Sequence, residues 1–239
     1  MSDRTIVVSC YNNNLDWLFE LLESRDDFSK DNIFIYDKGD QSLEKYSDKA
    51  TIEVCENIGY SLTSFCKYII GNYHNLSGTT IFIKGNVVPR HVTEEYFKRI
   101  FDNSCFTPIE EWEFHDQNQT ALQNGYAMFS PDGGWMELND SWYLNRTELP
   151  TKYFKTYNDF MDFCFKNPIH PKYVRFAPGG NYIVPKENLL KYDKIFYQNI
   201  KTIVEHHQLS GESHLIERFM HTMWSCNFEV ANTMKQELK

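Results

Sequence analysis

Short runs of β-branched and aromatic residues alternate with helix-like stretches over the first 100 residues of the chain. The runs cover residues 5–10, 32–39, 51–57 and 79–85, and helical spacing of apolar residues marks 15–25, 61–72 and 91–103. Continuous apolar runs are typical of strands buried on both faces, and strands that alternate with helices form parallel sheets. The sequence therefore predicts an α/β fold with a mostly parallel sheet flanked by helices.

The rest of the chain differs in character. A Pro-Gly-Gly turn precedes an expected strand at 181–185, and a helix is expected at 210–226 near the end. The middle, about 103–158, has little periodicity and is rich in turn formers and aromatic residues. We interpret residues 1–239 as a single domain in which 103–158 could form an inserted lobe.

Composition excludes several classes of protein. Aromatic residues make up 16% of the chain, which argues against disorder, and the net charge of −9 disfavours a surface that coats nucleic acid. The six cysteines form no C-x-x-C pair, so buried thiols are expected rather than zinc ligands or disulfides. No apolar stretch approaches the roughly 20 residues of a membrane span, and the N-terminal run is too short for a signal peptide. We expect a cytoplasmic protein.

The turns after the expected strands are the places to look for a binding site. In open parallel sheets, ligands bind outside the carboxyl ends of the strands. The polar candidates in or near these turns are Tyr11, Asn12, Asn14, Asp37, Lys38, Asn57, Gly59, Lys84, Gly85, Asn86, Arg90 and Arg175. The alternative for each is a structural role, since Asn, Asp and Gly are also the ordinary residues of turns.

The order of these features resembles a known fold. A strand and Tyr-Asn turn, a strand ending in "YDKGD", the stretch "ENIGYSLTSF" and the strand "TTIFIKGN" resemble the nucleotide-sugar-binding half of GT-A glycosyltransferases. More closely, the blocks "VVSCYNNNLDWL", "NIGYSLTSFCKYIIGNY", "RFAPGGNYIVPKENL" and "IERFMHTMW" resemble an uncharacterised, glycosyltransferase-like family, domain of unknown function 3431. The resemblance covers about residues 6 to 231 and implies a GT-A-like (Rossmann-like) fold.

The resemblance also implies a function. The chain is expected to transfer a sugar from a nucleotide-diphosphate sugar (UDP-, GDP-, CDP- or dTDP-linked) to an unknown acceptor such as a glycan. Tyr11, Asn12, Asn14 and Asp37 would then hold the nucleoside, and Glu217 or Glu212 on the last core helix would be the general base. The alternatives are a non-catalytic nucleotide- or carbohydrate-binding module and an enzyme that glycosylates a nucleic-acid base, which the acidic net charge disfavours.

One departure from the family pattern bears on the chemistry. The Asp-x-Asp motif that holds a metal on the diphosphate in GT-A enzymes is absent, and Lys84-Gly85-Asn86 stands in its place. We expect Lys84, Arg90 and the N–H groups of a following helix to stabilise the leaving group instead. Non-classical assistance by Mn²⁺ or Mg²⁺ is the alternative to a metal-independent site. Donor binding that depends sharply on Mn²⁺ through Asp37 or Asp40 would contradict both.

The last core helix carries the candidate bases. Glu217 is flanked by apolar residues, so burial is expected to raise its pKa. One alternative is that Glu217 only forms a surface contact with His221 or Arg218. A metal site formed by His214, Glu217 and His221 is a weaker alternative, because such spacing on a helix arises often by chance.

The middle region carries large aromatic residues. Trp135, Trp142 and Tyr143 could present a platform to a sugar face. We favour core packing for them, because large aromatic side chains are mostly buried.

Overall fold

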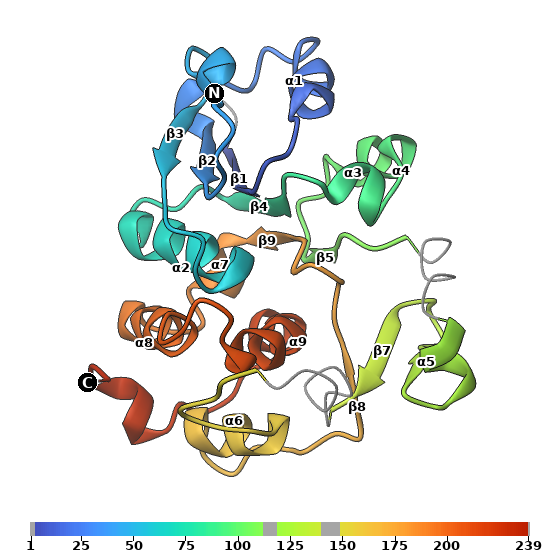
Figure 1. Ribbon diagram of the computed structural model, residues 1–239, viewed down its shortest axis with the longest axis vertical. Helices are drawn as coiled ribbons and strands as arrows, with labels where there is room; N and C mark the ends of the chain where they lie inside the picture. Colours follow the sequence, from blue (N-terminus) through green and yellow to red (C-terminus); the bar gives the residue numbers. More distant parts are fainter. Residues whose placement is uncertain (1–2, 112–118, 140–148, 239) are drawn as a thin grey trace.

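A six-stranded sheet runs through the centre of the computed structural model (Figure 1), which describes residues 3–111, 119–139 and 149–238. Its order is β3-β2-β1-β4-β9-β5, and the first four strands are parallel, whereas β9 is antiparallel to β4 and to β5. The strands are β1 (Arg4–Cys10), β2 (Ile33–Asp37), β3 (Thr51–Val54), β4 (Thr79–Lys84), β5 (Thr107–Pro108) and β9 (Tyr182–Pro185). The predicted mixed α/β fold with a mostly parallel sheet is confirmed.

The register of the parallel strands brings their ends together. Cys10 of β1 lies opposite Asp37 of β2, and Ser9 lies opposite Lys84 of β4. The strands β2 and β4 lie on opposite sides of β1, so the strand order reverses there. Crevices outside the carboxyl ends of strands at such a reversal are where open α/β sheets bind ligands.

The strand β3 differs from the prediction of a buried run. It is an edge strand of the described sheet, and most of its side chains are exposed, with Val54 79% exposed. Its β-branched residues reflect strand propensity rather than burial.

Helices cover both faces of the central sheet. The helices are α1 (Asp16–Leu22), α2 (Tyr60–Asn72), α3 (Val87–Arg90), α4 (Glu94–Ile100), α5 (Gln119–Gln123), α6 (Tyr157–Cys164), α7 (Lys186–Leu189), α8 (Lys194–Val204) and α9 (Gly211–Ser225), with 3-10 turns η1 (Lys30–Asn32), η2 (Glu44–Tyr46) and η4 (Asn232–Lys235). In Figure 1, α2, α8 and α9 lie on one side of the sheet and α1, α3 and α4 on the other. None of the described helices is long and apolar enough to cross a membrane.

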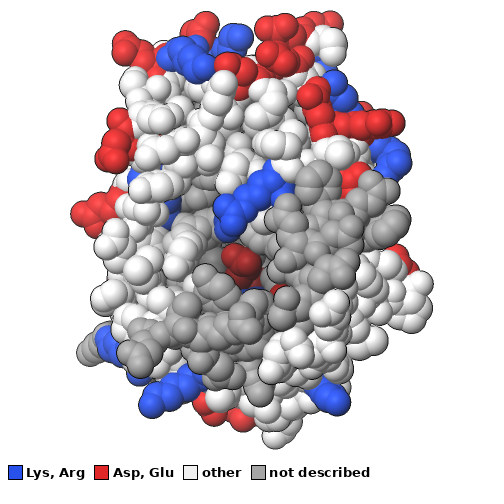
Figure 2. All heavy atoms as spheres, turned by 45° about the vertical axis from the view of Figure 1, so that its right-hand side comes forward, with Lys and Arg blue, Asp and Glu red and all other residues white. Residues whose placement is uncertain are grey.

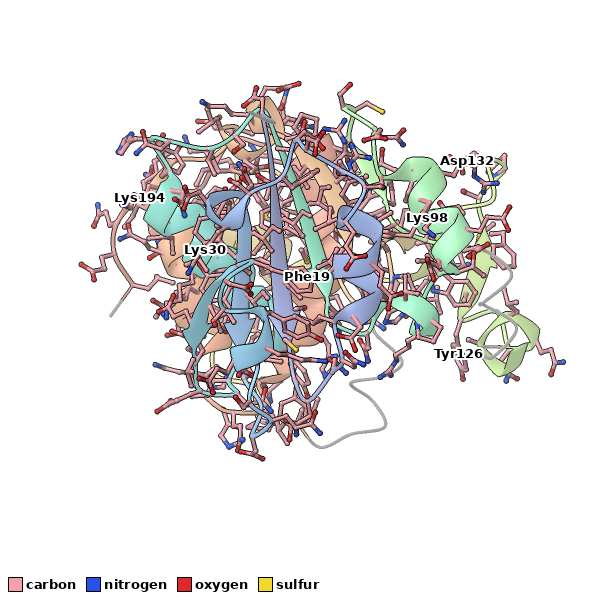
Figure 3. All side chains as sticks on the ribbon, turned by 90° about the horizontal axis from the view of Figure 1, so that it is seen from above. Phe19, Lys30, Lys98, Tyr126, Asp132 and Lys194 are labelled. Atoms are coloured by element: carbon pink, nitrogen blue, oxygen red, sulfur yellow. The ribbon has the colours of Figure 1, made fainter. Side chains whose placement is uncertain are left out.

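Two apolar clusters result from this arrangement. Ile6 and Val8 of β1 pack into the cluster beneath α1 and α4, where the ring of Phe19 lies against the strands (Figure 3). Val7, from the same strand, packs into the larger cluster with α2, α8 and α9. Successive side chains of a strand point to opposite faces, so a continuous apolar run is what a sheet covered on both sides requires.

A smaller antiparallel sheet, β6-β7-β8, lies beside the central one and is formed by β6 (Ala127–Phe129), β7 (Trp135–Leu138) and β8 (Tyr173–Arg175). The expected lobe at 103–158 therefore does not contain the whole small sheet, since β8 lies outside it, and β5 within it joins the central sheet. Trp135 is fully buried against Phe176, which confirms core packing for this residue. Trp142 and Tyr143 lie outside the described residues.

The cysteines are free thiols, as expected, but only some are buried. Cys10, Cys66 and Cys164 are buried in strands and helices, and Cys55 is half-buried. Cys105 and Cys226 are exposed, because one lies in the turn before β5 and the other directly after α9.

Candidate functional site

A cavity of about 290 Å³ opens at the carboxyl ends of β1 and β4, where the strand order reverses. Six of the predicted site residues line it: Tyr11, Lys38, Asn57, Lys84, Asn86 and Arg90. Six further lining residues were not predicted: Ser9, Asn13, Tyr60, Ser61, Gln208 and Leu209. Figure 2 shows a hollow near the centre of one face, in which a Lys or Arg surface lies beside an Asp or Glu surface.

Three cations line this cavity. Lys38 is buried, and its ammonium donates to the carbonyl oxygens of Ile58, at 2.7 Å, and Tyr60. Burial lowers the pKa of Lys38 to about 8. Lys84 is half-buried and Arg90 is exposed, and no ion pair of Arg90 is found among the described residues. Lys84 and Arg90 are thus the cations most accessible to an anionic ligand.

Lys84 forms an ion pair with Glu217 of α9. The Nζ atom of Lys84 lies 3.7 Å from Oε2 of Glu217, and the exposed fractions of the two side chains are 26% and 17%. The other carboxylate oxygen of Glu217 accepts a hydrogen bond of 3.2 Å from the Gly179 N–H. Glu217 is not among the residues that line the cavity, but its ion-pair partner Lys84 is.

The charge state of Glu217 differs from the expected one. Burial by itself raises the pKa of the Glu217 carboxyl, as predicted. The positive charge of Lys84 and, to a smaller extent, other neighbouring groups lower it, and together they have a larger effect than burial. The pKa therefore lies below its usual value, and the prediction of a raised pKa is wrong. Glu217 is an ionised carboxylate at neutral pH, the form in which a general base must be.

The predicted Gly-rich turn lies against this ion pair. Gly179 has φ +87°, and its carbonyl oxygen accepts a hydrogen bond of 3.3 Å from Ser61 Oγ of α2. Asn181, at the end of the turn, accepts a 2.8 Å hydrogen bond from the Lys84 N–H. The turn thus joins the end of β4, the start of α2 and the middle of α9 around one side of the site.

Alanine at position 179 is expected to disturb this junction. A Cβ atom there would lie 2.8 Å from Asn181 Nδ2 and 2.9 Å from His91 Nε2, on a backbone with positive φ. We expect Gly179→Ala to lower the free energy of unfolding by about 1–3 kcal/mol. Gly71→Ala is the matched control, because a Cβ atom at this α2 position meets nothing within 4 Å and alanine favours a helix. Denaturant unfolding measures both, and equal stability of the two variants would contradict the prediction.

Three predicted nucleoside-binding residues form hydrogen bonds with other residues of the chain. The Asn12 side-chain oxygen accepts hydrogen bonds from the N–H groups of Asp40 and Gln41, so it holds the turn after β2. Asn14 accepts from the Tyr46 hydroxyl at 2.7 Å. The buried Asp37 carboxylate accepts from the Gly39 N–H. None of the three residues is among those that line the cavity.

Gly59 and Gly85 support the site through the backbone. Gly59 has φ +64° and begins α2, which places Tyr60 and Ser61 in the cavity wall. A Cβ atom at Gly85 would lie 3.0 Å from Asn13 Oδ1, so glycine allows the turns after β1 and β4 to approach each other.

The expected helix N-terminus after Lys84 is not formed as predicted. The segment directly after β4 is α3, which has only four residues and a non-helical Val88, and α4 begins at Glu94. So short a helix has little dipole. The N–H groups of α3 therefore do not form the expected anion site at a helix end.

Arg175 and Glu212 lie away from the cavity. Arg175 of β8 forms ion pairs with Glu110, at 2.8 Å, and with Asp132, which Figure 3 shows at the side of the molecule. Glu212 is fully buried and accepts hydrogen bonds from the Tyr153 N–H, at 2.8 Å, and from His206 Nε2. Its carboxylate also accepts a hydrogen bond from the hydroxyl of Ser210 at the start of α9, and Glu212 is not among the residues that line the cavity.

The donor set does not fit a divalent cation. Mg²⁺ and Mn²⁺ prefer carboxylate oxygens, and the described lining of the cavity contains three cations and no Asp or Glu. Within residues 3–111, 119–139 and 149–238, no group of three His, Cys, Asp or Glu residues could hold a metal. His214 packs against the Tyr60 ring and His221 against Phe106, and burial lowers the pKa of each histidine to about 4.

At the mouth of the cavity, two apolar side chains lie among exposed polar residues of the lining. Tyr11 after β1 is 52% exposed and Leu209 before α9 is 47% exposed.

Some of the lining residues that were not predicted adjoin predicted ones, so the strand-end rule could have found them: Ser9, Asn13, Tyr60 and Ser61. Gln208 and Leu209 come from the connection between α8 and α9, and no local sequence signal identifies them.

A family model described as "Protein of unknown function (DUF3431)" matches residues 5–238. No curated protein and no solved structure matches the chain.

Proposed function

We propose that this chain, which belongs to the DUF3431 family, is a glycosyltransferase that moves a sugar from a nucleotide-diphosphate sugar to an acceptor hydroxyl group. The observation that carries the proposal is the pairing of Lys84 and Glu217 beside a cavity at the carboxyl edge of the parallel strands. A cation for the leaving group and a carboxylate for the acceptor proton are the two groups that such a transfer needs. We also propose that the α/β fold is GT-A-like.

The cations suit a diphosphate. Lys84 and Arg90 line the same cavity, and Arg90 has no ion-pair partner in the part of the chain that the structure describes. Ionised phosphate oxygens form strong, charge-assisted hydrogen bonds with such side chains. As the bond to the sugar breaks, the diphosphate gains negative charge, which these cations stabilise.

The mouth of the cavity suits a nucleoside. The exposed Tyr11 ring offers a flat face on which a base can stack, and Leu209 adds a second apolar surface. Asn57 and Gln208 provide side-chain amides, which both donate and accept hydrogen bonds. A ligand with a flat apolar ring at one end and negative charge at the other matches this distribution.

Glu217 is the general base in this proposal. The acceptor oxygen forms a bond to the anomeric carbon of the sugar while the bond from that carbon to the diphosphate oxygen breaks. The proton of the acceptor hydroxyl passes to the Glu217 carboxylate, and the electron pair of the broken bond leaves with the diphosphate. No step is assigned to a divalent cation, because the described lining offers it no carboxylate.

Removal of the Lys84 charge tests the diphosphate site. We expect Lys84→Met to weaken binding of the best nucleotide-diphosphate sugar by roughly 10- to 100-fold, because a charge-assisted hydrogen bond is lost. A thermal-shift screen of UDP-, GDP-, CDP- and dTDP-sugars, with and without Mn²⁺, first identifies that donor, since a ligand of the folded state raises the melting temperature. Titration calorimetry then compares the variant with the wild-type protein.

The control is Lys98→Met, which removes an exposed lysine of α4 that pairs with Glu94. It is expected to bind the donor as the wild-type protein does. Equal donor affinity of Lys84→Met would overturn the assignment of the diphosphate site. Donor binding without hydrolysis or transfer in the wild-type protein would favour a non-catalytic binding module.

A further inference from the structure

The ion pair between Lys84 and Glu217 links two functions of the site. Lys84 lines the cavity, and its Nζ lies 3.7 Å from Glu217 Oε2. Lys84 is a residue to which an anion can bind, and its charge also determines how readily Glu217 takes up a proton. A ligand that neutralises Lys84 therefore acts on Glu217 without touching it.

The other groups around Glu217 lower its pKa less than Lys84 does. Arg218, on the same helix, forms a buried ion pair of 2.6 Å with Glu137, which compensates its charge. Burial lowers the pKa of His214 to about 4, so its ring is neutral above pH 5. From the other packed elements, Gly179 offers only an N–H group and the buried Tyr182 is a neutral phenol whose pKa burial raises. His91 also lies near Gly179, where its Nε2 would be 2.9 Å from a Cβ atom at that position.

We infer that anion binding at Lys84 and proton binding at Glu217 are coupled, so that Glu217 becomes a stronger base when an anionic group occupies the cavity. An anion at Lys84 adds a negative charge near the carboxylate and offsets the charge that keeps it ionised. Linkage requires the effect to be reciprocal, so protonation of Glu217 also strengthens anion binding. The inference rests on the proposed function only for the nature of the anion, a diphosphate.

The coupling gives the site an order of events. Without a donor, Glu217 is a weak base, and with a donor its proton affinity moves towards the range in which general bases are effective. Donor binding at Lys84 therefore raises the proton affinity of Glu217, and Lys84 acts on the base as a positioning residue.

Carbon-13 NMR of the glutamate carboxyl groups tests the coupling directly. The Glu217 resonance is identified by its loss in Glu217→Gln, and its titration midpoint is measured in sodium chloride and in sodium sulfate of equal ionic strength. Sulfate stays a dianion over this pH range, so the probe does not itself titrate. We expect sulfate to raise the midpoint of Glu217 by about one pH unit.

Variants of Lys84 separate the coupling from a structural role. In Lys84→Met the Glu217 midpoint is expected to be high already in chloride and to be insensitive to sulfate. Lys84→Arg keeps the charge and is expected to restore both the low midpoint and the response. A midpoint that is the same in Lys84→Met and in the wild-type protein, or a sulfate response that persists in Lys84→Met, would overturn the inference.

The outcome is independent of turnover. Coupling in a protein that transfers no sugar would support this inference and refute the proposed function. The opposite result is also possible: sugar transfer could depend on Lys84 and Glu217 while the titration midpoint of Glu217 is the same in sulfate and in chloride. That result would support the proposed function and refute this inference.

Discussion

The Glu217→Gln variant is expected to lose about 10²–10⁴-fold in kcat for sugar transfer, because the acceptor hydroxyl then has no carboxylate to take its proton. The amide oxygen of glutamine can still accept the hydrogen bond from the Gly179 N–H, so the fold is expected to be retained. Donor binding should be unchanged or tighter, since the charge of Lys84 is no longer offset. Transfer rates at saturating donor, together with calorimetric donor affinities, measure both effects.

Glu212→Gln separates the two glutamates that the sequence offered as bases. Glu212 is fully buried and accepts hydrogen bonds from the N–H groups of Lys152 and Tyr153. This variant is expected to unfold at a lower temperature while the folded fraction keeps its kcat. If Glu217→Gln turned over like the wild-type protein, the base would have to be another residue.

The Arg218→Met variant is expected to lose about 3–5 kcal/mol of the free energy of unfolding, because it leaves the Glu137 carboxylate buried without its ion-pair partner. Arg218 and Glu137 are each only 6% exposed and lie 2.6 Å apart. Their pair connects α9 to β7 of the small sheet, and the guanidinium also donates to the His214 carbonyl oxygen. For a chain of this size the melting temperature should fall by roughly 6–20 °C.

The double variant Arg218→Met/Glu137→Leu tests the mechanism of that loss. Replacing both partners of a buried pair by apolar residues is often close to neutral, so most of the stability should return. Lys98→Met breaks an exposed pair on α4 and should change the free energy of unfolding by less than about 1 kcal/mol. A loss in Arg218→Met no larger than in Lys98→Met would show that the buried pair does not hold α9 to the small sheet.

The central part of the fold could be predicted because its signals are local. Two patterns indicate which faces are buried: the apolar runs of β1, β2 and β4, and the helical spacing of apolar residues in α2 and α9. Because side chains repeat every two residues in a strand and every 3.6 in a helix, these patterns also predict the type of element. The strand-end rule then led to the turns after β1 and β4. Lys84, Asn86 and Arg90 were found in this way because they follow one strand closely in sequence.

Other features of the site depend on contacts between distant segments. Asn12 and Asn14 have the same residue type and nearly the same position as Asn13, yet only Asn13 lines the cavity, because hydrogen-bond partners from residues 40–46 hold the other two. Gln208 and Leu209 reach the cavity only because α8 and α9 pack on the sheet.

The amino-acid sequence by itself determined the parallel sheet and the edge at which the candidate site lies, since both follow from runs of consecutive residues such as the strand that ends in Lys84-Gly85-Asn86. Only the tertiary structure decided that Glu217 faces Lys84, that its pKa lies below its usual value and that Arg175 is held elsewhere by Glu110 and Asp132. The reason is physical: electrostatic energies depend on distance and burial, and more than a hundred residues separate Lys84 from Glu217 along the chain.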